Sequence, residues 1–281
     1  MEVYADDTYQ IMLTRESPTP ESIDVEWRTS ILKYMFRECV EWDMEHLVFF
    51  LAVNLLDRAV ALPEVQDQLR SFQDFQNVTF LCFWIAGKVE GEQYLAPKMV
   101  TRMIHDAWTK EQLVAAERDL VARLDWRLHQ PLPLYFVWYY SNKCAAVGDK
   151  DERDWLYSAA AVVLTCLSVS RTIPHIKPSV LAFSCVAVAL HLSGIVGSTN
   201  SSGSSGHRWV WGCERRIVEG VRSRTHCYRA LKTVSKYTVA EHRSLISVAR
   251  ACYEKVVAYP FDAFGKRLQS LYGGRWRRAR R

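Results

Sequence analysis

The residue types that most often carry catalysis occur in this sequence without forming a recognisable catalytic motif. Its eight histidines are scattered, and it contains no Gly-rich dinucleotide or phosphate loop, no HExxH and no GxSxG. The acidic pairs Glu38/Glu41 and Glu90/Glu92 are typical of solvated helix or loop surfaces. These observations favour a binding protein over an enzyme.

The cysteines do not have the spacing of a metal site. The eight of them include no CxxC pair and no histidine at metal-ligand spacing, and most lie inside apolar helical patterns. We interpret them as reduced core residues, and we expect neither a metal nor a cofactor. They are Cys39, Cys82, Cys144, Cys166, Cys185, Cys213, Cys227 and Cys252.

The excess basic charge lies at one end of the chain. Lys and Arg number 36 against 31 Asp and Glu, and five arginines close the sequence, so residues 1–274 are balanced at 31 against 31. A neutral body argues against nonspecific nucleic-acid binding. The terminal arginines fit either a nuclear-localisation signal or a disordered, solubilising end, and we expect a nuclear pool. They are Arg275, Arg277, Arg278, Arg280 and Arg281.

Neither a signal peptide nor a membrane helix is expected. Met1–Tyr9 carries three acidic residues where a signal peptide needs a basic stretch and an apolar run, so we expect the chain to stay inside the cell. No stretch approaches the roughly 20 consecutive apolar residues of a membrane helix, so we expect no membrane partner.

Two charged residues stand at the ends of apolar helical patterns. Lys88 closes the most hydrophobic helix of the first half, and Glu117 lies in the run Leu113–Leu124. On the pattern alone, both are ordinary surface charges.

The elements that position these residues are all expected to be helices. Apolar residues recur at helical spacing through ten segments, five on each side of Pro131 and Pro133, and no segment has convincing strand alternation. We therefore predict an all-α fold of two helical domains in tandem. The segments are Glu26–Glu41, Glu45–Ala61, Phe75–Lys88, Pro97–Ala107, Lys110–Leu124 (opened by Thr109), Leu134–Cys144, Asp151–Ser170, Pro178–Leu192, His207–Arg222 and Thr238–Tyr259.

The corresponding domain boundaries are a flexible leader at 1–24, an N-terminal domain at 25–129, a C-terminal domain at 130–258 and a basic tail at 259–281. The Gly/Ser-rich residues 197–206 are expected to form a flexible connector inside the second domain.

The segment 27–58 (WRTSILKYMFRECVEWDMEHLVFFLAVNLLDR) resembles the start of the cyclin box, and the resemblance extends over residues of about 25–258. It implies two tandem five-helix cyclin-box domains, and an ion pair between Arg28 and Asp57 that locks two helices. Removing either partner of such a buried pair costs roughly 3–5 kcal/mol.

Two further segments, 81–91 (LCFWIAGKVEG) and 108–128, are similar to the cyclin helices that contact a kinase. The resemblance places Lys88 and Glu117 on the family's polar kinase contacts, which bind main-chain groups of the kinase. It also implies four apolar kinase contacts. These are Ile85, Val89, Val121 and Trp126.

The second half, with Pro178-Ser179 at a helix start, resembles D-type cyclins. An LxCxE motif in Met1–Asp24 and a long acidic degradation tail are both missing, and in this respect the chain resembles the cyclins of gammaherpesviruses. The resemblance implies an activating, non-catalytic subunit of a cyclin-dependent kinase that drives host cell-cycle progression. Retinoblastoma-family proteins would be substrates of the complex, which we expect in nucleus and cytoplasm. Catalysis, ATP and magnesium would belong to the kinase.

The substrate-docking groove of many cyclins, which accepts an Arg-x-Leu segment, is altered in this sequence. Alignment on Arg28 leaves only Ile31 and Gln76 with the family's character, while Ser30 removes apolar area and Arg37 replaces an attractive carboxylate. We predict weak Arg-x-Leu binding. The aligned groove positions are Trp27, Ser30, Ile31, Tyr34, Arg37 and Gln76.

Two alternatives stay open at this point. A tandem helical fold also occurs in nucleic-acid-binding transcription factors resembling TFIIB, but these carry a zinc ribbon of paired cysteines ahead of the repeats, and Cys39 already lies inside a helix. A helical scaffold without a kinase partner is equally compatible with the composition.

Overall fold

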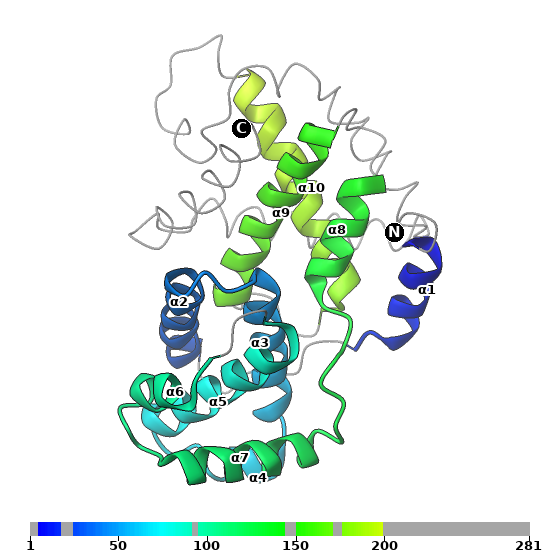
Figure 1. Cartoon of the computed structure of the whole chain (residues 1–281). Helices are drawn as coiled ribbons and strands as arrows, with labels where there is room; N and C mark the ends of the chain where they lie inside the picture. The colour runs from blue at the N-terminus through cyan, green and yellow to red at the C-terminus, as the bar shows by residue number, and fades with distance from the viewer. Residues whose placement is uncertain (1–4, 18–24, 92–94, 144–149, 171–175, 199–281) are drawn as a thin grey trace. The chain divides into compact units, whose positions relative to one another are not determined.

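The computed structural model describes residues 5–17, 25–91, 95–143, 150–170 and 176–198, and its described elements are all α-helices (Figure 1). The predicted all-α fold class is therefore confirmed. By Cα proximity the chain divides into two compact units. One unit contains the described residues of Arg15–Leu132 and Ser168–Lys177, and the other contains the described residues of Met1–Thr14, Pro133–Leu167 and Pro178–Arg281.

The first unit is built around two helices, α3 (His46–Ala59) and α5 (Phe72–Glu90), which pack directly against each other. Both helices are apolar on nearly every face and bury most of their side chains, as expected for helices inside a bundle. Burial of these aliphatic and aromatic side chains provides the core of the unit.

Four further helices surround that pair. α2 (Val25–Glu41) packs on both α3 and α5, while α6 (Pro97–Met103) and α7 (Lys110–Arg123) contact each other and α5. The short helix α4 (Pro63–Gln66) was not predicted from the sequence. It begins at a proline in the first turn, where the missing N–H has no intrahelical partner to lose.

The helix starts follow local capping chemistry. Ser71 caps α5 by accepting a hydrogen bond from the backbone N–H of Asp74, so α5 begins three residues before the predicted Phe75. Thr109 caps α7 in a reciprocal arrangement with Gln112, as its position before the apolar run predicts. α6 ends at Met103, earlier than predicted, because His105 and Asp106 adopt the left-handed conformation with φ of 55° and 54°.

The second unit contains α1 (Ala5–Arg15) as far as Thr14, α8 (Pro133–Lys143), α9 (Lys150–Ser170) as far as Leu167, and α10 (Pro178–Ser198). α8 and α10 pack directly against each other. Pro133 opens α8, close to the predicted boundary between the two halves of the chain. α10 extends to Ser198, so the first two residues of the predicted flexible connector 197–206 are helical.

The expectation of a flexible leader over residues 1–24 is wrong for residues 5–15, which form α1. Tyr9 is fully buried and stacks on Tyr139 of α8, with ring centroids 4.1 Å apart and an interplanar angle of 4°. The Tyr139 hydroxyl donates to Asp6 Oδ1 at 2.8 Å, and Lys143 Nζ lies 3.3 Å from the same oxygen. Burial, together with this carboxylate, raises the pKa of Tyr139. Contacts with α8, remote in sequence, order a segment that has little helical signal of its own.

Four cysteines lie in the described residues, and all four are buried and form no disulfide: Cys39, Cys82, Cys166 and Cys185. Burial raises the pKa of Cys39 and of Cys82, which keeps both thiols protonated. No helix within the described ranges is long and apolar enough to cross a bilayer. The predicted helices 207–222 and 238–259, the remainder of the connector, the arginine-rich tail and the other four cysteines lie outside the described residues.

Candidate partner-binding site

Lys88 and Glu117, which the helical pattern left as ordinary surface charges and the resemblance to cyclins placed on kinase contacts, form a close ion pair between two helices. Lys88 stands in the last turn of α5 and Glu117 in the middle of α7. The ammonium donates to both carboxylate oxygens at 2.7 Å. The two side chains remain 32% and 19% exposed, so the pair is accessible at the surface of its unit.

A tryptophan that sequence reasoning missed lies under the lysine. Lys88 Nζ is 3.4 Å from the ring centroid of Trp84, one helical turn earlier on α5. The indole N–H donates to the carbonyl of Leu95 at 3.0 Å, and the ring is almost fully buried. The spacing of four residues was the available signal, because positions i and i+4 share a helix face.

The ion pair retains hydrogen-bonding capacity. An ammonium has three N–H donors and a carboxylate has about four acceptor sites, so the Lys88–Glu117 contact leaves a donor and several lone pairs unused between them. Such a pair can bind a carbonyl and an N–H of another backbone at the same time, through charge-assisted hydrogen bonds.

The four expected apolar contacts differ greatly in exposure. Ile85 and Val121 are 2% and 6% exposed, so both belong to the core in this structure. Val89 is half-buried. Trp126 is 74% exposed, the largest value among the exposed large hydrophobic residues of the described chain.

Trp126 is presented by an unusual backbone. Asp125 and Trp126 both adopt left-handed φ angles, 53° and 58°, directly after α7. The Trp126 N–H donates to the Val121 carbonyl at 3.0 Å, which closes the helix end. A bulky residue in this region is a true outlier, so the fold sustains backbone strain while leaving a large aromatic side chain in water.

A second contact holds the segment after Trp126 to α5. His129 Nδ1 lies 3.1 Å from Glu90 Oε1, and Glu90 is two residues beyond Lys88. This contact connects the end of α5 with the chain that follows α7.

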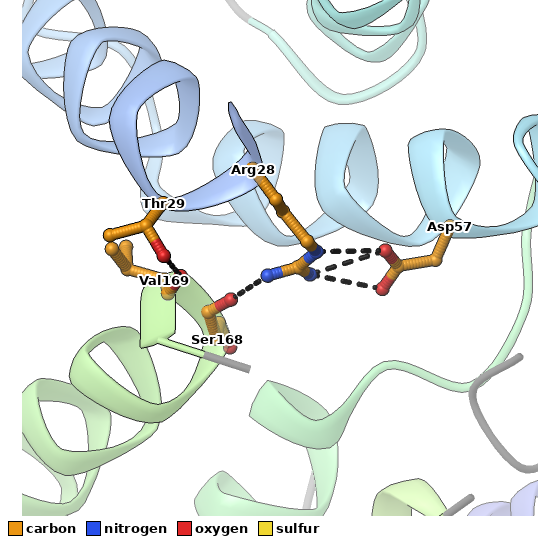
Figure 2. Close-up of polar contacts among 5 residues, drawn as sticks. All are labelled: Arg28, Thr29, Asp57, Ser168 and Val169. Atoms are coloured by element: carbon orange, nitrogen blue, oxygen red, sulfur yellow. Dashed lines mark hydrogen bonds and ion pairs between the residues drawn. The ribbon is translucent and has the colours of Figure 1, made fainter. Parts of the chain in front are cut away.

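The expected structural ion pair lies in the interior of the same unit (Figure 2). Arg28 of α2 donates three hydrogen bonds of 3.2 Å to the Asp57 carboxylate of α3, and both residues are buried. The remaining Nη1 donates to the carbonyl of Ser168, and Thr29 Oγ1 donates to the carbonyl of Val169 at 3.3 Å. Arg28 therefore also neutralises the carbonyl end of α9, a role that the sequence did not reveal.

The residues aligned with the docking groove do not all lie at the surface. Ile31 and Gln76, the two that retain the family's character, are 1% and 4% exposed, and Gln76 donates to the Met103 carbonyl at 2.7 Å. The half-buried Trp27 packs edge-on against Phe72, with centroids 6.2 Å apart.

Arg37 is less repulsive than the alignment implied, because a carboxylate accompanies it. Its guanidinium lies over the ring of Tyr34 at 4.6 Å and contacts Glu38 Oε1 at 3.2 Å. Glu38 also accepts a hydrogen bond from the Trp42 indole at 3.2 Å. Ser30 is exposed, which leaves this part of α2 without the apolar surface that a leucine side chain needs.

Comparisons with known proteins agree with this geometry. Residues 5–129 match the profile of the cyclin N-terminal domain. Putative cyclin-B3-1 of Arabidopsis thaliana is 24% identical over 204 residues, which are 68% of this chain and 49% of that protein. G1/S-specific cyclin-D1 of Bos taurus is 27% identical over 206 residues, which are 72% and 64% of the two chains. This chain thus spans about half to two thirds of the length of these relatives.

A solved structure has the same fold. The X-ray structure of a viral cyclin from herpesvirus saimiri superimposes with a TM-score of 0.61 at 16% identity, covering 91% of this chain and 97% of that one. The cyclin fold, and the resemblance of the sequence to cyclins that include D-type and viral members, are therefore confirmed.

Proposed function

We propose that this chain is the regulatory, activating subunit of a cyclin-dependent kinase and is not itself catalytic. The observation that carries the proposal is the Lys88–Glu117 ion pair, joined across α5 and α7 and accessible at the surface of a cyclin-type domain. The exposed Trp126, on the segment that follows α7, supplies the large apolar side chain that the centre of an interface favours.

The proposed mechanism is allosteric. The ion pair binds main-chain groups beside the mobile helix of the kinase, and Trp126 packs against the same partner. Binding energy then favours the kinase conformation in which that helix has moved inward and the kinase's own lysine and glutamate meet. ATP and magnesium are bound by the kinase.

The test is the double variant Lys88→Ala/Glu117→Ala. It removes both charges at once, so no unpaired charge is left to destabilise the fold. We expect loss of kinase activation in a reconstituted assay, with an unchanged helical circular-dichroism spectrum. The matched control is Asp119→Ala/Arg123→Ala, which removes a 2.7 Å ion pair from the same helix α7. Full activation by the Lys88/Glu117 variant would refute the assignment, and co-purification of a kinase from cells would separate this function from that of a scaffold.

We further propose that the chain acts as a viral, D-type-like cyclin in G1/S progression of a host cell, with retinoblastoma-family proteins as substrates of the complex. Its similarity to cyclin-D1 and to a viral cyclin supports this assignment. The test compares phosphorylation of a retinoblastoma-family protein by the reconstituted complex and by the kinase alone. No increase with the complex would argue against this assignment.

A further inference from the structure

The contact between Trp84 and Lys88 joins a buried aromatic ring to an accessible charge. The ring of Trp84 is 1% exposed, and its indole N–H is fixed to the Leu95 carbonyl at 3.0 Å. The Lys88 ammonium lies 3.4 Å from the ring centroid while it also bonds both oxygens of Glu117. The Trp84 ring is therefore held in place beneath the Lys88 ammonium, whereas Glu117 belongs to the other helix, α7.

A lysine head group normally has many positions available to it. Its four-carbon stem has flexible torsions, and the strongly hydrated ammonium gains little by leaving water. An aromatic face attracts a cation through the ring quadrupole, most strongly for tryptophan and more strongly where water is partly excluded. With the ring below it and the carboxylate beside it, the Lys88 ammonium has few other positions available.

We propose that Trp84 is a positioning residue, which holds Lys88 in the orientation required for partner binding. The inference rests on the proposed function of Lys88 and Glu117. Trp84 has almost no accessible surface, so it acts through Lys88 and does not touch the partner. Its contribution is preorganisation: the side-chain freedom that Lys88 would lose on binding is already lost in the free protein.

The test changes the electrostatic character of the ring with little change in its shape. Tryptophans carrying one, two or three fluorines are incorporated at position 84 of the full chain by nonsense suppression. Each fluorine weakens the negative potential of the ring face, so affinity for the kinase should fall stepwise. The whole cation–aromatic contribution corresponds to about a 2- to 30-fold change in Kd. Trp84→Leu, which removes the ring, should reach the full effect.

A spectroscopic measurement reports the position of the lysine in the absence of any partner. In wild-type protein with 13C-labelled lysine, the ring current of Trp84 should shift the Lys88 ε-methylene protons upfield, a signal assigned through Lys88→Arg. The shift should diminish along the fluorinated series and vanish in Trp84→Leu. The matched control places the same fluorinated residues at Trp42, whose described polar contact is with Glu38 and not with a lysine.

The outcomes separate this inference from the proposed function. Unchanged Kd across the fluorinated series, equal losses at position 42, or an unshifted ε-methylene signal in the wild type would each overturn the positioning role. Should Trp84→Leu not fold, the fluorinated series still decides. A different result would refute the proposed function: Lys88→Ala/Glu117→Ala still activates the kinase, while the wild-type protein shows the ring-current shift. The position of the lysine would then be a property of the fold alone.

Discussion

At the scale of single residues, Trp126 combines two unfavourable features. Its side chain is 74% exposed, and its backbone is left-handed, a conformation that costs a non-glycine residue roughly 1–2 kcal/mol. Neither feature favours folding. Strain and exposure together are typical of a side chain held for contact with another molecule.

Substitution of Trp126 can separate stability from binding. Trp126→Ala and Trp126→Gly both remove the side chain, but only glycine adopts a φ of 58° without strain. We expect the glycine variant to exceed the alanine variant by about 1 kcal/mol in free energy of unfolding, measured by denaturant titration. Kinase affinity should fall in both variants alike, by about 30-fold for an interface hot spot of ~2 kcal/mol. Wild-type affinity in either variant would exclude Trp126 from the interface.

At the scale of elements, α2 has two distinct sides. One side carries the buried residues Arg28 and Ile31, and Arg28 holds α2 to α3 and to the end of α9. Tyr34 and Arg37, with the exposed Ser30, lie on the more accessible positions. Burial and then the nearby Glu38 carboxylate raise the pKa of Tyr34, so its hydroxyl stays protonated. This accessible part of α2 offers charge and an aromatic ring but little aliphatic surface.

Weak docking of Arg-x-Leu segments is the prediction for this side of α2. Glu38 offsets part of the Arg37 charge, so lost apolar area at Ser30 contributes as well as repulsion. Titration of a labelled Arg-x-Leu peptide against the kinase complex measures it. We expect Arg37→Glu with Ser30→Ile to tighten binding by about fivefold or more, since an exposed ion pair contributes up to ~1 kcal/mol.

An Arg-x-Ala peptide provides the control for that titration, because it keeps the cationic group and lacks the leucine. Wild-type affinity equal to that of a cyclin with the intact groove would contradict the prediction. An equal response of both peptides to the double substitution would limit the effect to charge.

At the scale of the whole chain, the distribution of charge predicts a cellular location. The body is electrically balanced and the last seven residues contain five arginines. Dense arginine without acidic neighbours is typical of nuclear-localisation signals. We propose a nuclear pool beside a cytoplasmic one, and deletion of residues 275–281 should shift a tagged protein toward the cytoplasm. The nuclear fraction is measured by imaging, with Arg102→Gln, an exposed arginine of α6, as the control. An unchanged nuclear fraction after deletion would show that the tail is not the signal.

The sequence by itself determined most of the helices of the described chain and the class of fold. Hydrophobic periodicity and capping residues act over a few positions, so they place α2, α3, α5 and α7 within a few residues of their observed bounds. Short motifs determined the resemblance to cyclins for the same reason, because each motif is contiguous. Two helices were missed because neither has a long periodic pattern. α1 depends on its contacts with α8, and α4 is a short turn that begins at a proline.

Only the tertiary structure decided how the candidate site is assembled. Lys88 and Glu117 are 29 residues apart, and their 2.7 Å contact depends on how α5 and α7 pack. The exposure of Trp126 and the burial of Ile85 are set by neighbours from other elements, so residues of similar hydrophobicity end in opposite environments. The ring of Trp84 lies under Lys88 because the Leu95 carbonyl fixes its indole. Local sequence specifies which side chains are available, whereas long-range packing specifies which of them meet.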